Sequence, residues 1–217
     1  MKTVCISASN ILHSGERSTS HMLCAKISEI LQEKTVACEI VDLRKYRLSP
    51  CTGCGKCFDG RRCRNDADFN VIYEKIIGAD ALFIVSPHYA PIPAKLSMVL
   101  EKMEEIAFLH WWKDGGHQSE VHGTPAGIVS HGGAPAWALK SYKAMVNDTI
   151  ANALDTIQCR VVPYDSEWDT GISLPVEKVL EEEGIFPIQK YDWELLTQKL
   201  RNYIELVLEA ARQTAGR

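Results

Sequence analysis

Five short apolar segments alternate with amphipathic segments along the chain, and this alternation is the feature that most restricts its fold. The apolar segments are Thr3–Ile6, Thr35–Leu43, Ala81–Val85, Pro125–Val129 and Cys159–Val162. The segment Ala81–Val85 reads ALFIV, an uninterrupted apolar run typical of a strand that is covered on both faces. Strands that alternate with helices form a parallel sheet with helices on both sides. The sequence therefore predicts an α/β fold.

The segments between these strands carry apolar residues at helical spacing. Predicted helices follow Ser20, cover Asp66–Ile77, begin near Ile92 and at Pro135, and run from Asp192 to about Ala211. Residues 166–190 show neither pattern and are predicted to be irregular. The sequence contains no internal repeat, low-complexity segment or linker. We expect one domain over residues 1–217, with a Cys-rich loop at 49–65 and an irregular insertion at 165–190 before the last helix.

Composition limits the classes of partner. The 217 residues suit one sizeable domain, and 46% hydrophobic with 24% charged residues is typical of a globular protein. A formal net charge of −4 gives no electrostatic reason to expect nucleic acid or an anionic membrane as a partner. No apolar run approaches the roughly 18–20 residues that span a bilayer, and the N-terminus does not have the pattern of a signal peptide. We expect a cytoplasmic protein.

The loop between the first strand and the first helix is rich in hydroxyl side chains around one cation, Arg17. The hydroxyl residues are Ser7, Ser9, Ser14, Ser18, Thr19 and Ser20. Backbone N–H groups and the positive end of the dipole at a helix start bind anions, and an arginine adds a forked contact. Neither standard Gly-rich phosphate motif is present, because Gly15 is the only glycine in the loop. The pattern favours a phosphomonoester site; the alternative is an ordinary loop with Ser18 as helix N-cap.

Two further loops should lie beside it, because ligands of such sheets bind beyond the carboxyl ends of the strands. They are Ser86–Pro91 (SPHYAP) and Ser130–Pro135 (SHGGAP). Tyr89 offers an aromatic ring, and Gly132-Gly133 lets backbone approach a flat group closely. Taken singly, these residues also fit a loop anchor and a turn. Together with the hydroxyl loop they predict a site for a planar cofactor with a phosphate tail.

At these residues the chain resembles the NAD(P)H-dependent FMN reductases and iron–sulfur flavoproteins of flavodoxin-like fold, from about Lys2 to Val162. The similarity is carried by the spacing of Ser7 and Ser9, by the run Ser49-Pro50-Cys51-Thr52-Gly53-Cys54, and by SPHY before a helix with Ala94 and Leu96. The resemblance implies a five-stranded parallel sheet of order 2-1-3-4-5, a three-layer sandwich with FMN at the strand ends.

The resemblance also implies the roles of individual residues. Phosphate would lie in the loop Ser9–Ser20, and the flavin ring against Pro87–Ala90 and Ser130–Gly133. The expected cofactor-binding residues are Ser7, Ser9, Arg17, Ser18, Thr19, Ser20, Ser86, Pro87, His88, Tyr89, Ala90, Ser130, His131, Gly132 and Gly133. His88, Tyr89 and His131 are ring neighbours only, and no catalytic acid or base is nominated. NAD(P)H would be the co-substrate, a small molecule such as a quinone or free flavin the acceptor, and a homodimer or homotetramer the assembly.

The match departs from the family pattern in three places. Family members often have Lys and then Asp-Arg in the helix after the Tyr loop, where this chain has Ser97, Glu101 and Lys102. The segment Trp111–His122 and the region after Tyr164 have no counterpart. The resemblance therefore does not extend to substrate preference.

Four of the eight cysteines follow the spacing Cys51-x2-Cys54-x2-Cys57-x5-Cys63. Cysteines at this spacing on a loop can converge on one centre, and four of them match the ligand number of a [4Fe–4S] cluster. The spacing differs from the two-cluster ferredoxin run and from the separated pairs of a zinc ribbon. The resemblance places these four residues at the ligand positions of iron–sulfur flavoproteins. The other cysteines lie in apolar patterns and are predicted to be buried: Cys5, Cys24, Cys38 and Cys159.

The four cysteines of this loop also allow other interpretations. Similar loops occur in flavin reductases without a cluster, and structural zinc, free thiols or a disulfide are alternatives. Arg61, Arg62 and Arg64 would offset the charge of a thiolate-bound cluster, or would simply be solvated. Three functions follow: an FMN-dependent oxidoreductase, an electron carrier between a ferredoxin-like donor and FMN, or a flavin-free protein with a structural metal.

Overall fold

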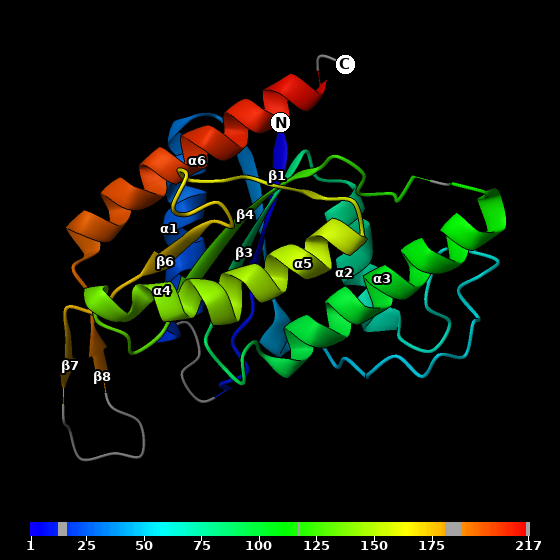
Figure 1. The fold of residues 1–217 in the computed structure, drawn as a ribbon, viewed down its shortest axis with the longest axis horizontal. Helices are drawn as coiled ribbons and strands as arrows, with labels where there is room; N and C mark the ends of the chain where they lie inside the picture. The colour runs from blue at the N-terminus through cyan, green and yellow to red at the C-terminus, as the bar shows by residue number, and fades with distance from the viewer. Residues whose placement is uncertain (13–16, 117, 181–187, 216–217) are drawn as a thin grey trace.

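The computed structural model describes residues 1–12, 17–116, 118–180 and 188–215, and Figure 1 shows their arrangement. The strands are β1 (Lys2–Ser7), β2 (Ala37–Asp42), β3 (Ala81–Pro87), β4 (Pro125–His131), β5 (Arg160–Val161), β6 (Ile172–Leu174), β7 (Lys178–Leu180) and β8 (Ile188–Lys190). The helices are α1 (Thr19–Glu33), α2 (Ala67–Ile77), α3 (Ala94–Asp114), α4 (Leu139–Tyr142), α5 (Asp148–Thr156) and α6 (Trp193–Ala215), with short 3₁₀ turns at Leu43–Lys45 and Ala136–Ala138.

The central sheet is parallel and has the order β2-β1-β3-β4-β5, which confirms the predicted order. Every residue of β3 and of β4 is buried, as expected for strands covered on both faces. The last position of the sheet is shared between two strands. β5 pairs with the first residues of β4, and β6 pairs in parallel with its last three.

The insertion predicted to be irregular therefore contains regular structure. Ile172–Leu174 extends the sheet as β6, and β7 and β8 pair in antiparallel fashion as a separate ribbon, seen at the lower left of Figure 1. These strands are only three residues long, too short for an alternation of apolar and polar residues to be recognised in the sequence.

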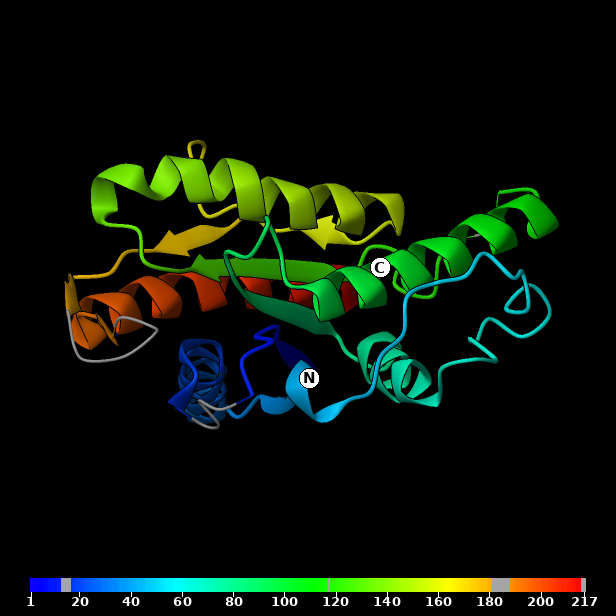
Figure 2. The same ribbon diagram turned by 90° about the horizontal axis from the view of Figure 1, so that it is seen from below.

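Helices cover both faces of the sheet, as Figure 2 shows when it is compared with Figure 1. On β1, alternate side chains enter opposite cores: Val4 and Ile6 pack with α2, α3 and α5, whereas Cys5 packs with α1 and α6. Cys5, Cys24 and Cys159 are buried as predicted, but Cys38 is only half-buried because β2 is an edge strand. The layers are those of the expected flavodoxin-like sandwich.

The helix predicted from Pro135 is one helical run with a change of winding inside it. A π-helical turn over Lys143–Asn147 separates α4 from α5. The Asn147 amide in this turn donates to the carbonyl oxygens of Thr170 and Ile172, at 3.3 and 3.2 Å. The π turn thus directs a buried amide at the backbone leading into β6, which fixes that short strand beside β4.

Of the helices in the described ranges, none combines the length and apolar character that a membrane crossing requires.

Candidate functional site

The predicted site residues meet at the carboxyl edge of the sheet. Register pairs Ser7 at the end of β1 with Val85 of β3, and Pro87 at the end of β3 with His131 at the end of β4. The three loops are therefore neighbours, although more than a hundred residues separate Ser7 from His131 along the chain. This edge is called the strand-end site below.

The hydroxyl loop brings a buried hydroxyl without a partner to the strand-end site. Ser7 is fully buried, and its Oγ finds no hydrogen-bond partner among the described residues. Ser9 Oγ accepts a hydrogen bond from the Ile11 amide at 3.2 Å. A buried hydroxyl that lacks a partner carries a desolvation cost, which a bound ligand would offset. Ser14 and Gly15 lie outside the described residues.

The start of α1 is left open by its own cap residue. Ser18 occupies the N-cap position, as in the alternative reading of this loop, but its side chain makes no cap hydrogen bond within the described structure. Arg17 is exposed, Thr19 is half-buried, and Ser20 is buried. First-turn N–H groups that the N-cap side chain does not satisfy suit an anion.

His131 is buried at the end of β4 and bonded to Ser20 of α1. The Ser20 Oγ lies 2.7 Å from His131 Nε2, while Nδ1 has no partner in the described part of the chain. Burial lowers the pKa of His131 to about 3. The ring is therefore neutral near pH 7, and it ties the first turn of α1 to β4.

The loop after β3 presents an aromatic ring. The His88 amide donates to the His131 carbonyl at 3.1 Å, and the His88 ring stacks on Tyr142 at 5.1 Å between centroids. Tyr89 stays 37% exposed, so its ring is accessible. Ser86 Oγ donates to the Pro87 carbonyl, and Ala90 has φ +47° before a cis peptide to Pro91.

The loop after β4 is packed against residues that sequence reasoning did not select. A Cβ at Gly132 would lie 2.6 Å from the Tyr142 ring, so any other residue there would displace Tyr142, whereas Gly133 has more room. Tyr191 donates to the Gly132 carbonyl at 3.3 Å, and Ser130 Oγ lies 2.6 Å from Ser173 Oγ. Tyr142, Ser173 and Tyr191 have no local sequence signal, because only the tertiary fold brings them to this edge.

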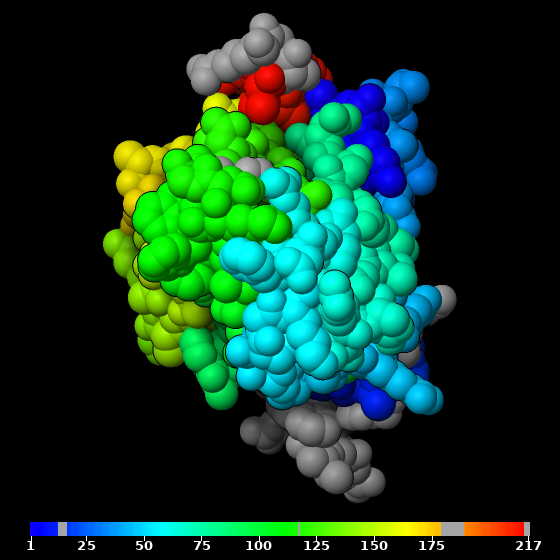
Figure 3. All heavy atoms as spheres, turned by 90° about the vertical axis from the view of Figure 1, so that its right-hand side faces the viewer, coloured from blue at the N-terminus to red at the C-terminus, as the bar shows by residue number. Residues whose placement is uncertain are grey.

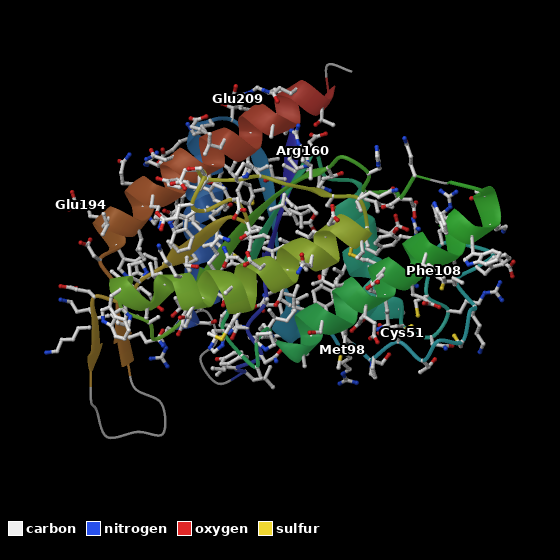
Figure 4. All side chains as sticks on the ribbon, viewed as in Figure 1. Cys51, Met98, Phe108, Arg160, Glu194 and Glu209 are labelled. Carbon is white, nitrogen blue, oxygen red and sulfur yellow. The ribbon has the colours of Figure 1, made fainter. Side chains whose placement is uncertain are left out.

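The four spaced cysteines surround one cavity, called the cysteine cavity below. Its volume is about 110 Å³, and Cys51, Cys54, Cys57 and Cys63 all line it. Figure 3 shows this loop on the surface beside the end of α3, and Figure 4 labels Cys51 next to the same helix. Cys54 is exposed and Cys57 is buried, while the other two are half-buried.

Helix α3 holds the cysteine loop along its length. The Cys51 amide donates to Glu101 at 2.9 Å, and the His110 ring lies 3.3 Å from the Cys57 carbonyl. Lys102 also reaches the start of the loop, where it donates to the Ser49 carbonyl. The loop is thus placed by side chains rather than by strand pairing.

Helix α2 holds the two ends of the same loop. Asp66, the N-cap of α2, accepts from the Ser49 and Phe69 amides at 3.0 and 2.9 Å and pairs with Lys102 at 2.8 Å. Burial alone would raise the pKa of Asp66, but hydrogen bonds from Lys102 and from both amides hold this pKa below its usual value. Asn70 exchanges two hydrogen bonds with the backbone of Cys63. These contacts hold both ends of the loop that lines the cavity.

The described side chains around the cysteine cavity lie apart from one another. Within the described residues, no three His, Cys, Asp or Glu side chains are close enough to hold one metal ion. Four cysteines around one cavity fit a group large enough to bridge them, because a [4Fe–4S] cluster takes one thiolate at each of its four irons. Hydrogen bonds from the Lys56 backbone and the Thr52 hydroxyl lower the pKa of Cys54, whereas burial raises that of Cys57.

Sequence comparison adds two curated relatives. Over 75 residues the chain is 31% identical to an iron–sulfur flavoprotein of Methanosarcina thermophila, which covers 34% of this chain and 39% of that protein. Over 86 residues it is 25% identical to an iron–sulfur flavoprotein of Methanocaldococcus jannaschii, covering 39% and 45%. The matched segments span less than half of either relative.

Solved structures share the fold. RosB with the bound intermediate 8-demethyl-8-formylriboflavin-5'-phosphate superposes with a TM-score of 0.67 at 16% identity, over 100% of this chain and 81% of that one. FerB, a flavoenzyme NAD(P)H:(acceptor) oxidoreductase from Paracoccus denitrificans, gives 0.58 at 10% identity over 98% and 97%. The apo form of the NADH:FMN oxidoreductase EMOB gives 0.56 at 15% identity over 96% and 89%. Identities this low show a common fold alone.

The profile of one protein family matches residues 1–162, from the first strand through the fifth. The match covers well over half of the chain and includes all three loops of the strand-end site and the four spaced cysteines. The chain belongs to the family of NADPH-dependent FMN reductases.

Proposed function

We propose that the protein is an FMN-dependent oxidoreductase that passes electrons from NAD(P)H through FMN to a small acceptor such as a quinone or free flavin. The observation that carries this proposal is the buried, unpartnered Ser7 hydroxyl where the loops after β1, β3 and β4 meet. His131 Nδ1 is a second buried polar atom at the same edge without a partner among the described residues. Orphaned polar atoms of this kind indicate a ligand that completes their hydrogen bonds.

The residues of the strand-end site divide between the two ends of FMN. The Ser7 and Ser9 hydroxyls and the open start of α1 suit the phosphate, with Arg17 close in sequence. Tyr89 and the Gly132-Gly133 backbone suit the flat ring. Bound FMN would supply hydride acceptance and electron transfer, and the chain positions it. His131 stays neutral, so its part is orientation through Ser20 rather than proton transfer.

The first experiment is the visible spectrum and FMN content of the purified protein, followed by turnover with NADH and with NADPH. We expect about one FMN per chain and oxidation of one nucleotide when a quinone or free flavin is present. Protein that neither carries nor takes up FMN would overturn the proposal. Flavin without turnover on either nucleotide would favour an electron carrier instead.

A double variant tests the phosphate end. Arg17→Ala with Thr19→Ala should raise the FMN dissociation constant about tenfold, because a charge-assisted contact and a hydroxyl are both removed. Lys26→Ala is the matched control, since it removes a half-buried cation from α1, where Lys26 pairs with Glu29. FMN affinity that is equal in the double variant and the control would contradict this phosphate site.

A second candidate is an iron–sulfur group in the cysteine cavity, which would make the protein an electron carrier between a ferredoxin-like donor and FMN. The supporting observation is that the four spaced cysteines line one cavity. Iron, acid-labile sulfide and zinc in anaerobically purified protein test it. Iron with matching sulfide supports the cluster, whereas zinc alone or no metal excludes it.

We further propose that the protein assembles as a homodimer or homotetramer. Light scattering coupled to size-exclusion chromatography measures the molar mass of the assembly directly. A monomer at micromolar concentration would contradict the proposal.

A further inference from the structure

We propose that Lys102 sets the redox potential of the cysteine cavity, by fixing a buried positive charge on its wall. This role rests on the proposed iron–sulfur group, and it concerns a residue that is not a ligand. Lys102 lines the cavity together with the four cysteines.

The Lys102 side chain is buried and held rigidly. It is 3% exposed, its Nζ lies 2.8 Å from Asp66 Oδ2, and it donates to the Ser49 carbonyl. It also lies over the Phe69 ring, 5.5 Å from the centroid. A buried lysine with this many partners keeps one position.

The carboxylate that pairs with Lys102 belongs to Asp66, which is not part of the cavity wall. Asp66 Oδ1 accepts from the Phe69 amide, and Oδ2 accepts from the Ser49 amide and hydroxyl as well as from Lys102. The negative charge is thus spread over the N-terminus of α2 and the start of the cysteine loop. Asp66 does not line the cavity, whereas Lys102 does. Of the two partners of the ion pair, the cation is therefore the one on the cavity wall.

The other charged side chains on the cavity wall are less buried. Lys56 and Arg64 are exposed, and Glu105 is half-buried. Water and salt screen exposed charges strongly and buried charges weakly. Of the charged side chains that line the cavity in the described structure, Lys102 is the buried one, so it acts on the occupant with the least screening.

The sign of the effect follows from charge. A group held by four thiolates is negative, and its one-electron reduction adds another negative charge without making or breaking a bond. A fixed cation stabilises the reduced state more than the oxidised state. Lys102 therefore raises the midpoint potential.

Replacing Asp66 should shift the midpoint potential in the direction opposite to replacing Lys102. Replacing Lys102 by Met removes the cation and should lower the midpoint potential. Asp66→Asn removes the opposing negative charge and keeps an N-cap acceptor for α2, so it should raise the potential. A role limited to anchoring the loop predicts no such pair of opposite shifts.

The experiment is an EPR-monitored dithionite titration of anaerobically purified holoprotein, with iron and sulfide measured first. We expect Lys102→Met to reduce the equilibrium constant for one-electron reduction at least about tenfold, which is about 59 mV. Lys102→Arg should stay within about threefold of the wild type. Lys95→Met is the matched control on α3, because Lys95 binds the carbonyls of Leu43, Arg44 and Tyr46 and does not line the cavity. Its cluster potential should not move.

The outcomes separate the two proposals. Wild-type protein without iron and sulfide overturns the cluster and the role of Lys102 with it. A loaded cluster whose potential is unchanged in Lys102→Met, or shifts in the same direction in both variants, overturns the role of Lys102 alone. If Lys102→Met fails to load, Asp66→Asn decides: a higher potential supports the proposal, and an unchanged or lower one overturns it.

Discussion

The strand-end site and the cysteine cavity are built by different means. At the strand-end site, buried polar side chains come from three strands that are distant in sequence, and backbone pairing sets their positions: Ser7, Ser86, Ser130 and His131. At the cavity, all four cysteines lie between positions 51 and 63, and side chains of α2 and α3 hold the loop.

This difference predicts different sensitivities. The strand-end site is stabilised by the whole sheet, so single polar substitutions there should change ligand binding more than folding. The cysteine loop depends on a small number of buried anchors, so removing one anchor should destabilise it strongly. The following variants test that contrast.

Asp66→Ala should have the largest effect, a loss of about 3–5 kcal/mol in unfolding free energy, because Lys102 is left buried without its partner and α2 loses its cap. Urea unfolding measures it. Asp68→Ala is the matched control in the same helical turn, where an exposed bond to the Arg47 amide is removed, and should cost about 1 kcal/mol or less. Equal costs for the two variants would show that the loop has no dominant anchor.

His131 should make the strand-end site acid-sensitive. Its pKa falls from 6.5 to about 3 on folding, so below about pH 6.5 the unfolded chain binds a proton that the folded chain does not. Stability should fall by about 1.4 kcal/mol per pH unit as the pH drops from about 6 to 4.5. Urea unfolding of the apoprotein across this range should show a smaller slope for His131→Gln, while His122→Gln on an exposed loop keeps the wild-type slope. An unchanged slope in His131→Gln would show that His131 is not the source of the acid sensitivity.

Ser7→Ala and Ser173→Ala should separate binding from folding. Ser7 Oγ has no partner in the described structure, so its removal should leave apoprotein stability unchanged or slightly higher, yet weaken FMN binding about tenfold, or about 1.4 kcal/mol. Ser173 Oγ bonds Ser130, so its removal should cost about 1–2 kcal/mol of stability. Calorimetric FMN titration and urea unfolding measure the two quantities. If Ser7→Ala lost stability and kept normal FMN affinity, Ser7 would serve folding rather than FMN binding.

Replacing Arg62 or Arg64, near the end of the cysteine loop, should change stability least. Arg62 bonds Glu74 and Glu120 at 2.5 and 2.8 Å, so Arg62→Gln should cost about 1 kcal/mol. Arg64 lies 3.9 Å from Asp59, both largely exposed, and Arg64→Gln should cost less than about 0.3 kcal/mol. Thermal unfolding at low and high salt resolves the two, and the cost in Arg62→Gln should shrink with salt. Equal costs would mean that the end of the loop is not anchored through Arg62.

The sequence by itself determined the strands of the parallel sheet and grouped the candidate residues of both sites, whereas the strand order was implied by the family resemblance. Apolar runs such as Ala81–Val85 identify buried parallel strands, because only strands covered on both faces lack polar alternation. Cys51, Cys54, Cys57 and Cys63 were identifiable because their grouping is a property of local spacing, which survives any packing of the rest of the chain.

Only the tertiary structure decided which side chains complete these sites. Tyr142 lies in a helix that the sequence predicts, but its contact with the loop after β4 is set by packing, and Ser173 lies in β6, which is too short to show a pattern. Tyr191 likewise reaches the Gly132 carbonyl only in the folded chain. Lys102 looks in the sequence like a polar interruption of an amphipathic helix, yet in the fold it is a buried cation beside four cysteines. Burial and long-range pairing are properties of the packed chain, so a local pattern of residues does not contain them.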